Sequence, residues 1–393
     1  MSAGSRFVGS VPVGLRVLNE VVSAHTHDHI DWADRLTQLR TADTLDSDAL
    51  SAIARRLVAA LPPTPTIVDL GCGAGGMSTH FARGLATHGG GTLVLVDATP
   101  ELLAEAEKSV RAAVDTASNA ADAVAGQATR GAVGGAGSTG SRSGSDDRAD
   151  GGSANAAFDT SAVDAPATRA RVGGAGSVGR RPTSSDRAEG GSTSSATGVV
   201  EVRVVRGDLA DAGLPGVLPA ADLVWASRVV HHLPDQQEAV GTVAAVAKAG
   251  GLVALAEGGL DFRCLPWDLG VGRPGLEDRL LAAQAEWFIG MREGIEGAVA
   301  MPYGWSTALE RAGLTDVDSF GALVHHRAPG PAMLAEYVVH RVARIFEFGG
   351  EYLTPDDRET LTSLLDPDGP YNLAARRDLY LTGAKIVHCG RRS

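Results

Sequence analysis

The sequence has few cysteines, and none of them is placed to bind a metal. Cys72, Cys264 and Cys389 are the only three, and no two of them form a Cys-x-x-Cys pair. Isolated thiols of this kind give neither a disulfide framework nor a thiolate metal site. They are typical of proteins from a reducing compartment, so we expect a cytoplasmic location and no metal.

The sequence also lacks long hydrophobic runs, and it has fewer positive than negative charges. No stretch approaches the roughly 20 apolar residues of a membrane-spanning helix, and residues 1–20 lack the apolar core of a secretory signal. The net charge is −12, and an acidic surface repels phosphate backbones. We therefore expect a soluble protein with neither a membrane nor a nucleic acid as partner.

Residues 115–198 are nearly free of large apolar side chains and rich in Gly, Ser, Ala, Asp and Arg. Within them VGGAGSTGSRSGSDDRADGGS, from Val133, recurs with changes as VGGAGSVGRRPTSSDRAEGGS, from Val172. Neither copy has an apolar stripe through which repeats could stack. The composition predicts a long, duplicated, disordered insert in a folded chain.

Outside the insert, strand-like and helix-like segments alternate. Short apolar runs such as PTIVDLG and GTLVLVD are each followed by a segment with helical character. This alternation predicts an α/β fold with a doubly wound, Rossmann-like, mostly parallel seven-stranded sheet. Ligands of such sheets bind at the carboxyl ends of the strands. The last strand, in 378–393, is expected to be antiparallel and to lie at the edge of the sheet.

The stretch IVDLGCGAGGMSTHFA contains Gly71, Gly73 and Gly76 and so fits the pattern G-x-G-x-x-G. The glycines alone indicate only a tight turn and a close approach to a ligand. A nicotinamide dinucleotide would place its pyrophosphate at the next helix N-terminus, where Asp69 would repel it. Asp69 favours a cationic ligand such as S-adenosylmethionine, which has a sulfonium, an ammonium and no phosphate. Asp97, ending the second strand, could accept ribose hydroxyls from either cofactor.

Five motifs, in their order along the chain, resemble those of class I S-adenosylmethionine-dependent methyltransferases. They are VDLGCGAGG (68–76), LVLVDATPELLAEA (93–106), VVRGDLAD (204–211), ADLVWASRVVHHLPD (221–235) and AKAGGLVALAEGG (247–259). More closely, HHLPDQQ, AEGG and RCLPWDLGVGRPGLEDRL resemble a group of actinobacterial methyltransferases of the small-molecule type. The resemblance covers most of the chain except the insert.

The resemblance implies how the first two strands hold the cofactor. Gly71 and Gly73 would line its methionine part, Asp69 would support its ammonium through water, and Asp97 would hold its ribose. From the residues alone, Asp69 could instead cap the helix that follows it.

The same resemblance extends to the third and fourth strands. Asp208, with Leu209 beside it, would meet the adenine edge, although Asp208 could instead be a turn residue. Ser227 and Arg228 would approach the reactive side of the cofactor.

The resemblance also implies that an N-terminal segment lies over the cofactor, with Trp32 and Arg35 as candidate lid residues. The expected segments are: 1–64, N-terminal helices over the cofactor site; 65–114, first part of the core; 115–198, the insert; 199–260, second part of the core; 261–300, a substrate cap; 301–325, a core helix and strand six; 326–377, a helical cap; and 378–393, the last strand and tail.

Methyl transfer needs a general base only if the acceptor atom is protonated at rest. His231 and His232 directly follow the fourth strand, and histidine titrates near neutral pH, so they are the catalytic candidates. Either could instead cap the next helix or bind a backbone carbonyl. Their side chains should point apart, which argues against a metal site. Glu257, ending the fifth strand, could pair with Arg263 or orient a substrate.

Aromatic residues make up only 5% of the chain, but several gather after the fifth strand. Such a group could line an apolar acceptor pocket or form the core of a cap. The substrate-binding candidates are Glu257, Arg263, Trp267, Trp287, Tyr303 and Trp305, with Phe288 and Met291 in the same stretch.

The sequence thus predicts an enzyme that uses S-adenosylmethionine to methylate an oxygen or nitrogen of a small, partly apolar molecule. An NAD(P)-dependent oxidoreductase with the same glycine loop is one alternative, which Asp69 and the lack of a Tyr-x-x-x-Lys pair disfavour. A non-catalytic cofactor-binding or interaction protein, in which the repeats are the functional part, is another.

Overall fold

The computed structural model describes residues 32–133 and 198–393. The chain divides into two compact units, one made of residues 1–123 with 195–393 and the other of residues 124–194. The first unit contains the whole sheet and the helices that cover it. All that follows concerns this unit, apart from the end of one helix.

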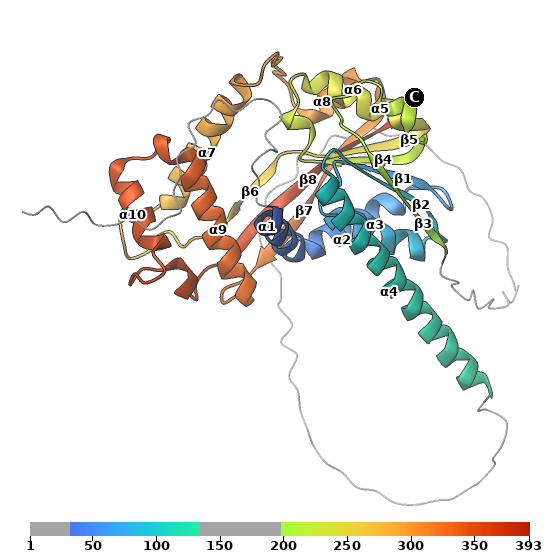
Figure 1. Ribbon diagram of the computed structural model, residues 1–393, viewed down its shortest axis with the longest axis horizontal. Coiled ribbons are helices and arrows are strands. Elements are labelled where there is room, and N and C mark those ends of the chain that lie inside the picture. Colours follow the sequence, from blue (N-terminus) through green and yellow to red (C-terminus); the bar gives the residue numbers. More distant parts are fainter. Residues whose placement is uncertain (1–31, 134–197) are drawn as a thin grey trace, which may run out of the picture. The chain divides into compact units, whose positions relative to one another are not determined.

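A mixed sheet forms the centre of the first unit (Figure 1). Its order is β3-β2-β1-β4-β5-β8. β5 and β6 pair one after the other along the same side of β8, and β7 pairs with the opposite side of β8. Strands β1 to β5 are parallel, which confirms the predicted doubly wound α/β sheet with seven strand positions. The strands are β1 Thr66–Leu70, β2 Gly91–Asp97, β3 Val200–Arg206, β4 Ala221–Ser227, β5 Ala247–Ala256, β6 Gly259–Arg263, β7 Leu314–His326 and β8 Leu381–Arg392.

The last strand is antiparallel, as expected, but the expectation that it lies at the edge is wrong. β8 pairs with β5 and β6 on one side and with β7 on the other. β7 is the edge strand instead. The pairing of β7 with β8 shifts in register between Thr315 and Asp318. Such irregular pairing protects an exposed sheet edge from pairing with further strands.

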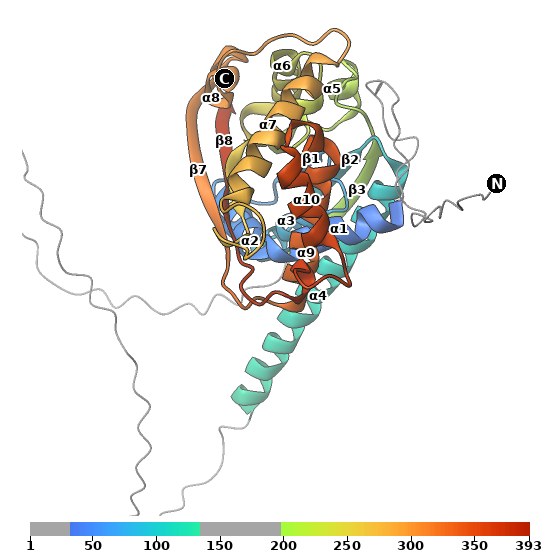
Figure 2. The ribbon, with the colours of Figure 1, turned by 90° about the vertical axis from the view of Figure 1, so that its left-hand side faces the viewer.

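Helices cover both faces of the sheet (Figure 2). Along each core strand, alternate side chains enter two apolar cores: Ile67 joins the one under α2, α3 and α4, whereas Val68 joins the one under α5, α6 and α8. The helices are α1 Trp32–Leu45, α2 Ser47–Val58, α3 Gly76–Thr87, α4 Pro100–Val133, α5 Leu214–Val217, α6 Gln236–Val246, α7 Leu276–Glu293, α8 Trp305–Arg311, α9 Ala332–Gly349 and α10 Pro355–Leu365.

The cap is made of two parts of the chain that are distant in sequence. α7 packs on α9, and α10 also contacts α9; these helices lie together beside the sheet in Figures 1 and 2. α1 contacts both α3 and α9, so it joins the core to the cap. Trp32 and Arg35 lie in α1, but their side chains are not among those described.

The predicted start of the insert, residue 115, falls inside a helix. α4 continues to Val133 because residues 115–133 are rich in alanine, which has the highest helix propensity. The rest of the predicted insert, 134–197, lies outside the described residues. The described chain rejoins the sheet at Gly198, whose N–H donates to the carbonyl of Ala86.

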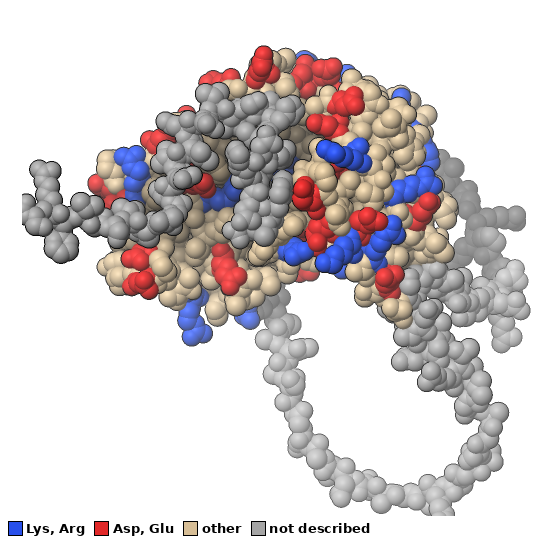
Figure 3. Space-filling view, viewed as in Figure 1, with Lys and Arg blue, Asp and Glu red and all other residues tan. Residues whose placement is uncertain are grey.

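Two further features bear on possible partners. Acidic and basic side chains lie side by side over the face shown in Figure 3.

Within residues 32–133 and 198–393, every helix is too short or too polar to cross a membrane.

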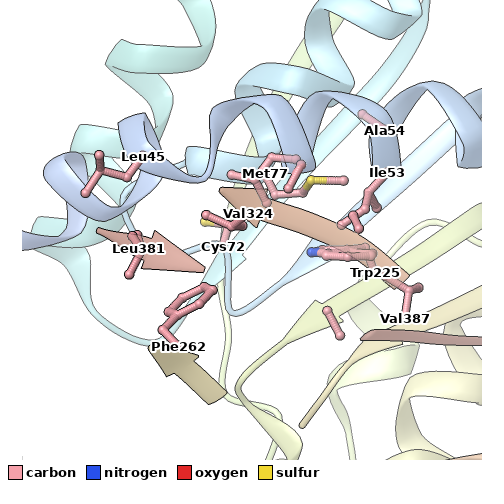
Figure 4. Packing of buried hydrophobic residues seen from close by; sticks show 14 of the residues in the cluster. Leu45, Ile53, Ala54, Cys72, Met77, Trp225, Phe262, Val324, Leu381 and Val387 are labelled. Carbon is pink, nitrogen blue, oxygen red and sulfur yellow. The ribbon is translucent and has the colours of Figure 1, made fainter. Parts of the chain in front are cut away.

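Trp225 (Figure 4) is the largest fully buried side chain of the core and is 1% exposed. Its ring packs edge-on against that of Phe81, with the ring centroids 5.7 Å apart. We expect Trp225→Ala to lower the free energy of unfolding by about 3–5 kcal/mol, because it leaves a cavity. Urea denaturation measures this. The matched control is Trp267→Ala, at a ring that is 68% exposed; equal losses in the two variants would contradict this description of the core.

Candidate active site

The loop between β1 and α3 is built around left-handed glycines. Gly71 has φ +67° and Gly73 has φ +55°. A Cβ on Gly71 would collide with the side chain of Val229, whereas a Cβ on Gly73 would meet nothing within 4 Å. The requirement for glycine at 71 therefore comes from the loop after β4. The open space beside Gly73 is where a ligand can approach the backbone.

Asp69 lies beneath this loop and is almost inaccessible. It is 2% exposed, and the hydroxyl of Ser78 donates to its carboxylate. Burial raises its pKa to about 7, the hydrogen bond from Ser78 opposes this, and the nearby charges of Asp97 and Asp43 raise it further. The idea that Asp69 supports an ammonium through water stays a prediction.

Asp97 ties the glycine loop to the end of β2. Its Oδ2 accepts from the N–H of Gly73 at 2.9 Å, and its Oδ1 accepts from the N–H of Thr99 at 2.9 Å. These bonds fix the carboxylate in one orientation. Each oxygen keeps a second lone pair, which is what a pair of ribose hydroxyls would need.

The other predicted cofactor residues follow in order along the same edge of the sheet. Asp208, after β3, is exposed, and its Oδ1 accepts from the N–H of Ala210 at 2.9 Å. Asp208 is therefore a turn residue, which was the alternative role considered for it. Leu209 is buried in the apolar core. Ser227 is half-buried at the end of β4. The order β3-β2-β1-β4 puts these positions on both sides of the glycine loop.

Asp43 is a site residue that sequence reasoning missed. It lies in α1, and a Cβ on Gly76 would collide with its carboxyl group, so this group covers the start of α3. Burial and the charge of Asp46 raise its pKa to about 6, while Lys385 and Arg228 lower it. The sequence does hold one signal for Asp43: it lies in the last turn of a helix, where a negative charge interacts unfavourably with the helix dipole.

Glu257 and His231 form a buried pair. Oε2 of Glu257 lies 2.6 Å from Nδ1 of His231, and Oε1 accepts from the N–H groups of Val229 and Val230 at 3.0 and 2.9 Å. Glu257 is 1% exposed. Its carboxylate therefore holds the loop after β4 and the imidazole together. Of the two roles considered for Glu257, pairing with Arg263 is wrong, because Arg263 pairs with Asp278 on α7; orienting a substrate stays a prediction.

The cap contacts the same imidazole. Phe288 on α7 has its ring centroid 5.8 Å from that of His231. The ring of His232 lies 4.0 Å from that of His231, so the expectation that the two side chains point apart is wrong: the 3-10 turn at Val230–His232 brings the rings together. Arg292, also on α7, donates to the carbonyls of His231 and Leu233 at 3.1 and 2.7 Å. Burial lowers the pKa of Arg292. α7 thus positions the loop that carries His231.

The aromatic substrate candidates do not meet in one pocket. Trp267 is exposed, whereas Trp287 packs against Phe348 of α9 with ring centroids 5.0 Å apart. Tyr303 donates to Oε1 of Gln237 at 3.0 Å, and both it and Trp305 pack on the core under α6 and α8. Proximity in sequence was misleading here, because the chain crosses from the cap to the sheet between α7 and α8.

Part of the chain matches a known protein family. Residues 181–255, which include β3 to β5, match a family model described as a methyltransferase domain. No curated protein matches the sequence.

Solved structures resemble the chain only distantly. The YcgJ protein of Bacillus subtilis is 13% identical, with a TM-score of 0.36, covering 88% of this chain and 99% of that one. An S-adenosylmethionine-dependent methyltransferase of Thiobacillus denitrificans, in complex with S-adenosyl-L-homocysteine, is 13% identical, with a TM-score of 0.34, covering 86% and 90%. Strands β3 to β5 of the doubly wound sheet thus resemble part of a methyltransferase domain.

Proposed function

We propose that the protein transfers a methyl group to an oxygen or nitrogen atom of a small, partly apolar molecule, with His231 as the general base. The observation that carries the proposal is the His231–Glu257 pair at the end of β4, beside the glycine loop. Membership of the actinobacterial small-molecule group, which rests on HHLPDQQ, AEGG and the segment after β6, is part of the same proposal.

The charges around the glycine loop suit the cofactor. Asp43, Asp69 and Asp97 surround it, and burial raises the pKa of Asp43 to about 6 and of Asp69 to about 7. A cation relieves such crowding of carboxylates, whereas a pyrophosphate would add to it. This argues against the nicotinamide alternative. The cofactor, when bound, supplies a methyl group activated by the sulfonium. Gly73 would approach it and Asp97 would hold its ribose.

His231 is set up to accept a proton. An ionised carboxylate only accepts hydrogen bonds, so Nδ1–H of His231 donates to Glu257 and Nε2 keeps its lone pair. Glu257 acts as a positioning residue, because its remaining oxygen is held by two backbone N–H groups. An acceptor hydroxyl beside Nε2 would lose its proton to the imidazole as its oxygen attacks the methyl group, whereas an acceptor ammonium would lose its proton to the imidazole before its nitrogen attacks.

The apolar part of the acceptor would lie against α7. Phe288 is half-buried and faces His231, and an aromatic ring there can hold the acceptor in line with the methyl group and exclude water. Of the predicted substrate residues, Trp287 on the same helix stays a candidate. Trp267, Tyr303 and Trp305 are less suited, because one faces solvent and two pack on the opposite core.

Calorimetric titration tests the cofactor site. We expect S-adenosylmethionine to bind the wild type and to bind Asp97→Ala at least tenfold more weakly, a loss of about 1.4 kcal/mol or more. Asp211→Ala is the control, because that exposed carboxylate only closes a turn onto Gly213. No binding by the wild type would refute the cofactor assignment, and saturable NADH binding would revive the oxidoreductase alternative.

Kinetics test the base. With an acceptor that supports turnover, we expect His231→Gln to lower kcat by about 10²–10⁴-fold with little change in cofactor affinity. His325→Gln, at an exposed histidine on β7, is the control and should keep the wild-type kcat. A kcat of His231→Gln equal to that of the wild type would rule out His231 as the base.

The raised pKa of Asp69 predicts that charging this carboxyl destabilises the cofactor-free protein. A folded-state pKa of about 7 against 3.8 for the ordinary carboxyl means that the folded state holds the extra proton below about pH 7. The stability contribution is therefore present at low pH and lost as the pH rises through about 7.

Thermal unfolding between about pH 5.5 and 8 tests this. We expect Asp69→Asn to lose less stability than the wild type as the pH rises. His80, whose pKa burial lowers to about 4, acts in the opposite sense, so the comparison of the two proteins is the test. Asp211→Asn is the control. Parallel curves for the wild type and Asp69→Asn would contradict the charge balance described above.

A further inference from the structure

A buried ion pair lies on the acceptor side of the site, outside the residues used so far. Nζ of Lys385 on β8 is 2.6 Å from Oδ2 of Asp46, which sits between α1 and α2, and the two side chains are 15% and 10% exposed. Lys385 shares its face of β8 with Leu381 and Val387, both in the apolar core. Burying two charges costs desolvation energy, so such a pair is weak evidence of a stabilising role.

Arg228 brings a second cation to the same place. It follows β4 directly, and its φ of +56° is strained for a residue with a side chain. Burial is the main cause of the shifted pKa values of Asp43, Lys385 and Tyr337, and the positive charge of Arg228 lowers all three. The neighbouring residue Val229 packs against Gly71, so the backbone of Arg228 lies beside the glycine loop.

The guanidinium of Arg228 has no carboxylate within ion-pair distance in the part of the chain that the structure describes. Asp46 is occupied by Lys385. Arg228 is also exposed, so it can meet a ligand.

The sheet order places these cations away from the cofactor's nucleoside. Asp208 and Asp97 follow β3 and β2, on one side of the glycine loop. Arg228 and Lys385 belong to β4 and β8, on the other side, where His231 also lies. α9 contributes Tyr337 from the cap. A molecule held between the methyl donor and the cap would meet these groups.

We infer that the methyl acceptor carries a carboxylate and that Arg228 binds it. This inference rests on the proposed function and narrows its substrate class. A planar guanidinium binds a carboxylate through two parallel hydrogen bonds. A single unpaired cation matches one negative charge, and Asp43 and Asp46 nearby would repel the second charge of a phosphate.

The test uses binding, so it does not require the acceptor to be known. The protein is saturated with S-adenosylhomocysteine and titrated with three matched pairs: acetate and acetamide, benzoate and benzamide, and phenylacetate and phenylacetamide. We expect at least one acid to bind tenfold or more tightly than its amide. Arg228→Gln should abolish the preference, and Arg228→Lys should retain part of it, because lysine keeps the charge but loses the two-point geometry.

Controls separate the outcomes. Arg203→Gln, at an exposed arginine on β3, should keep the wild-type preference. The inference is overturned if no acid binds more tightly than its amide, if Arg228→Gln keeps the preference, or if phenylphosphonate binds more tightly than benzoate. If Arg228→Gln does not fold, the wild type and Arg228→Lys still decide the matter. Failure to bind S-adenosylhomocysteine at the first step would instead count against the proposed function.

Discussion

The rest of the structure depends on how buried negative charge is held at one edge of the sheet. Asp69, Asp97 and Glu257 lie at or just beyond the ends of three parallel strands, and each is satisfied differently. The hydroxyl of Ser78 donates a hydrogen bond to Asp69, and backbone N–H groups donate to Asp97. Glu257 accepts from backbone N–H groups and is hydrogen-bonded to His231. Groups that would be costly to leave unpaired thereby fix the loops that form the site.

The sequence was sufficient to place Asp69, Asp97 and the glycine loop at the carboxyl ends of β1 and β2. Its signals are local: an apolar run ends in an acid or a glycine, a helix follows, and parallel pairing then sets the strand ends side by side. Asp69, Asp97 and the glycine loop were therefore predicted in their observed places. The extent of α4 was missed because low apolar content was taken to mean disorder, although alanine alone favours a helix.

The surroundings of Asp43 and Lys385 could not be predicted because they depend on contacts between distant parts of the chain. Asp43 reaches the glycine loop only because α1 packs on α3, and Lys385 meets Asp46 only because β8 lies inside the sheet. Conversely, aromatic residues that are close in sequence separate between the cap and the opposite core. The pairing of His231 with Glu257 required the register of β4 and β5, which no local pattern contains.

The interior position of β8 has a consequence for how the enzyme matures. β8 is synthesised after the strands that flank it, and β7 pairs with no other described strand. β5 and β7 cannot be joined into one sheet until β8, which follows both in the sequence, lies between them. Lys385 meets Asp46 only at that step. This ion pair is therefore a late feature of folding, whereas β1 and β2, which carry the glycine loop and Asp97, are adjacent in sequence and pair directly.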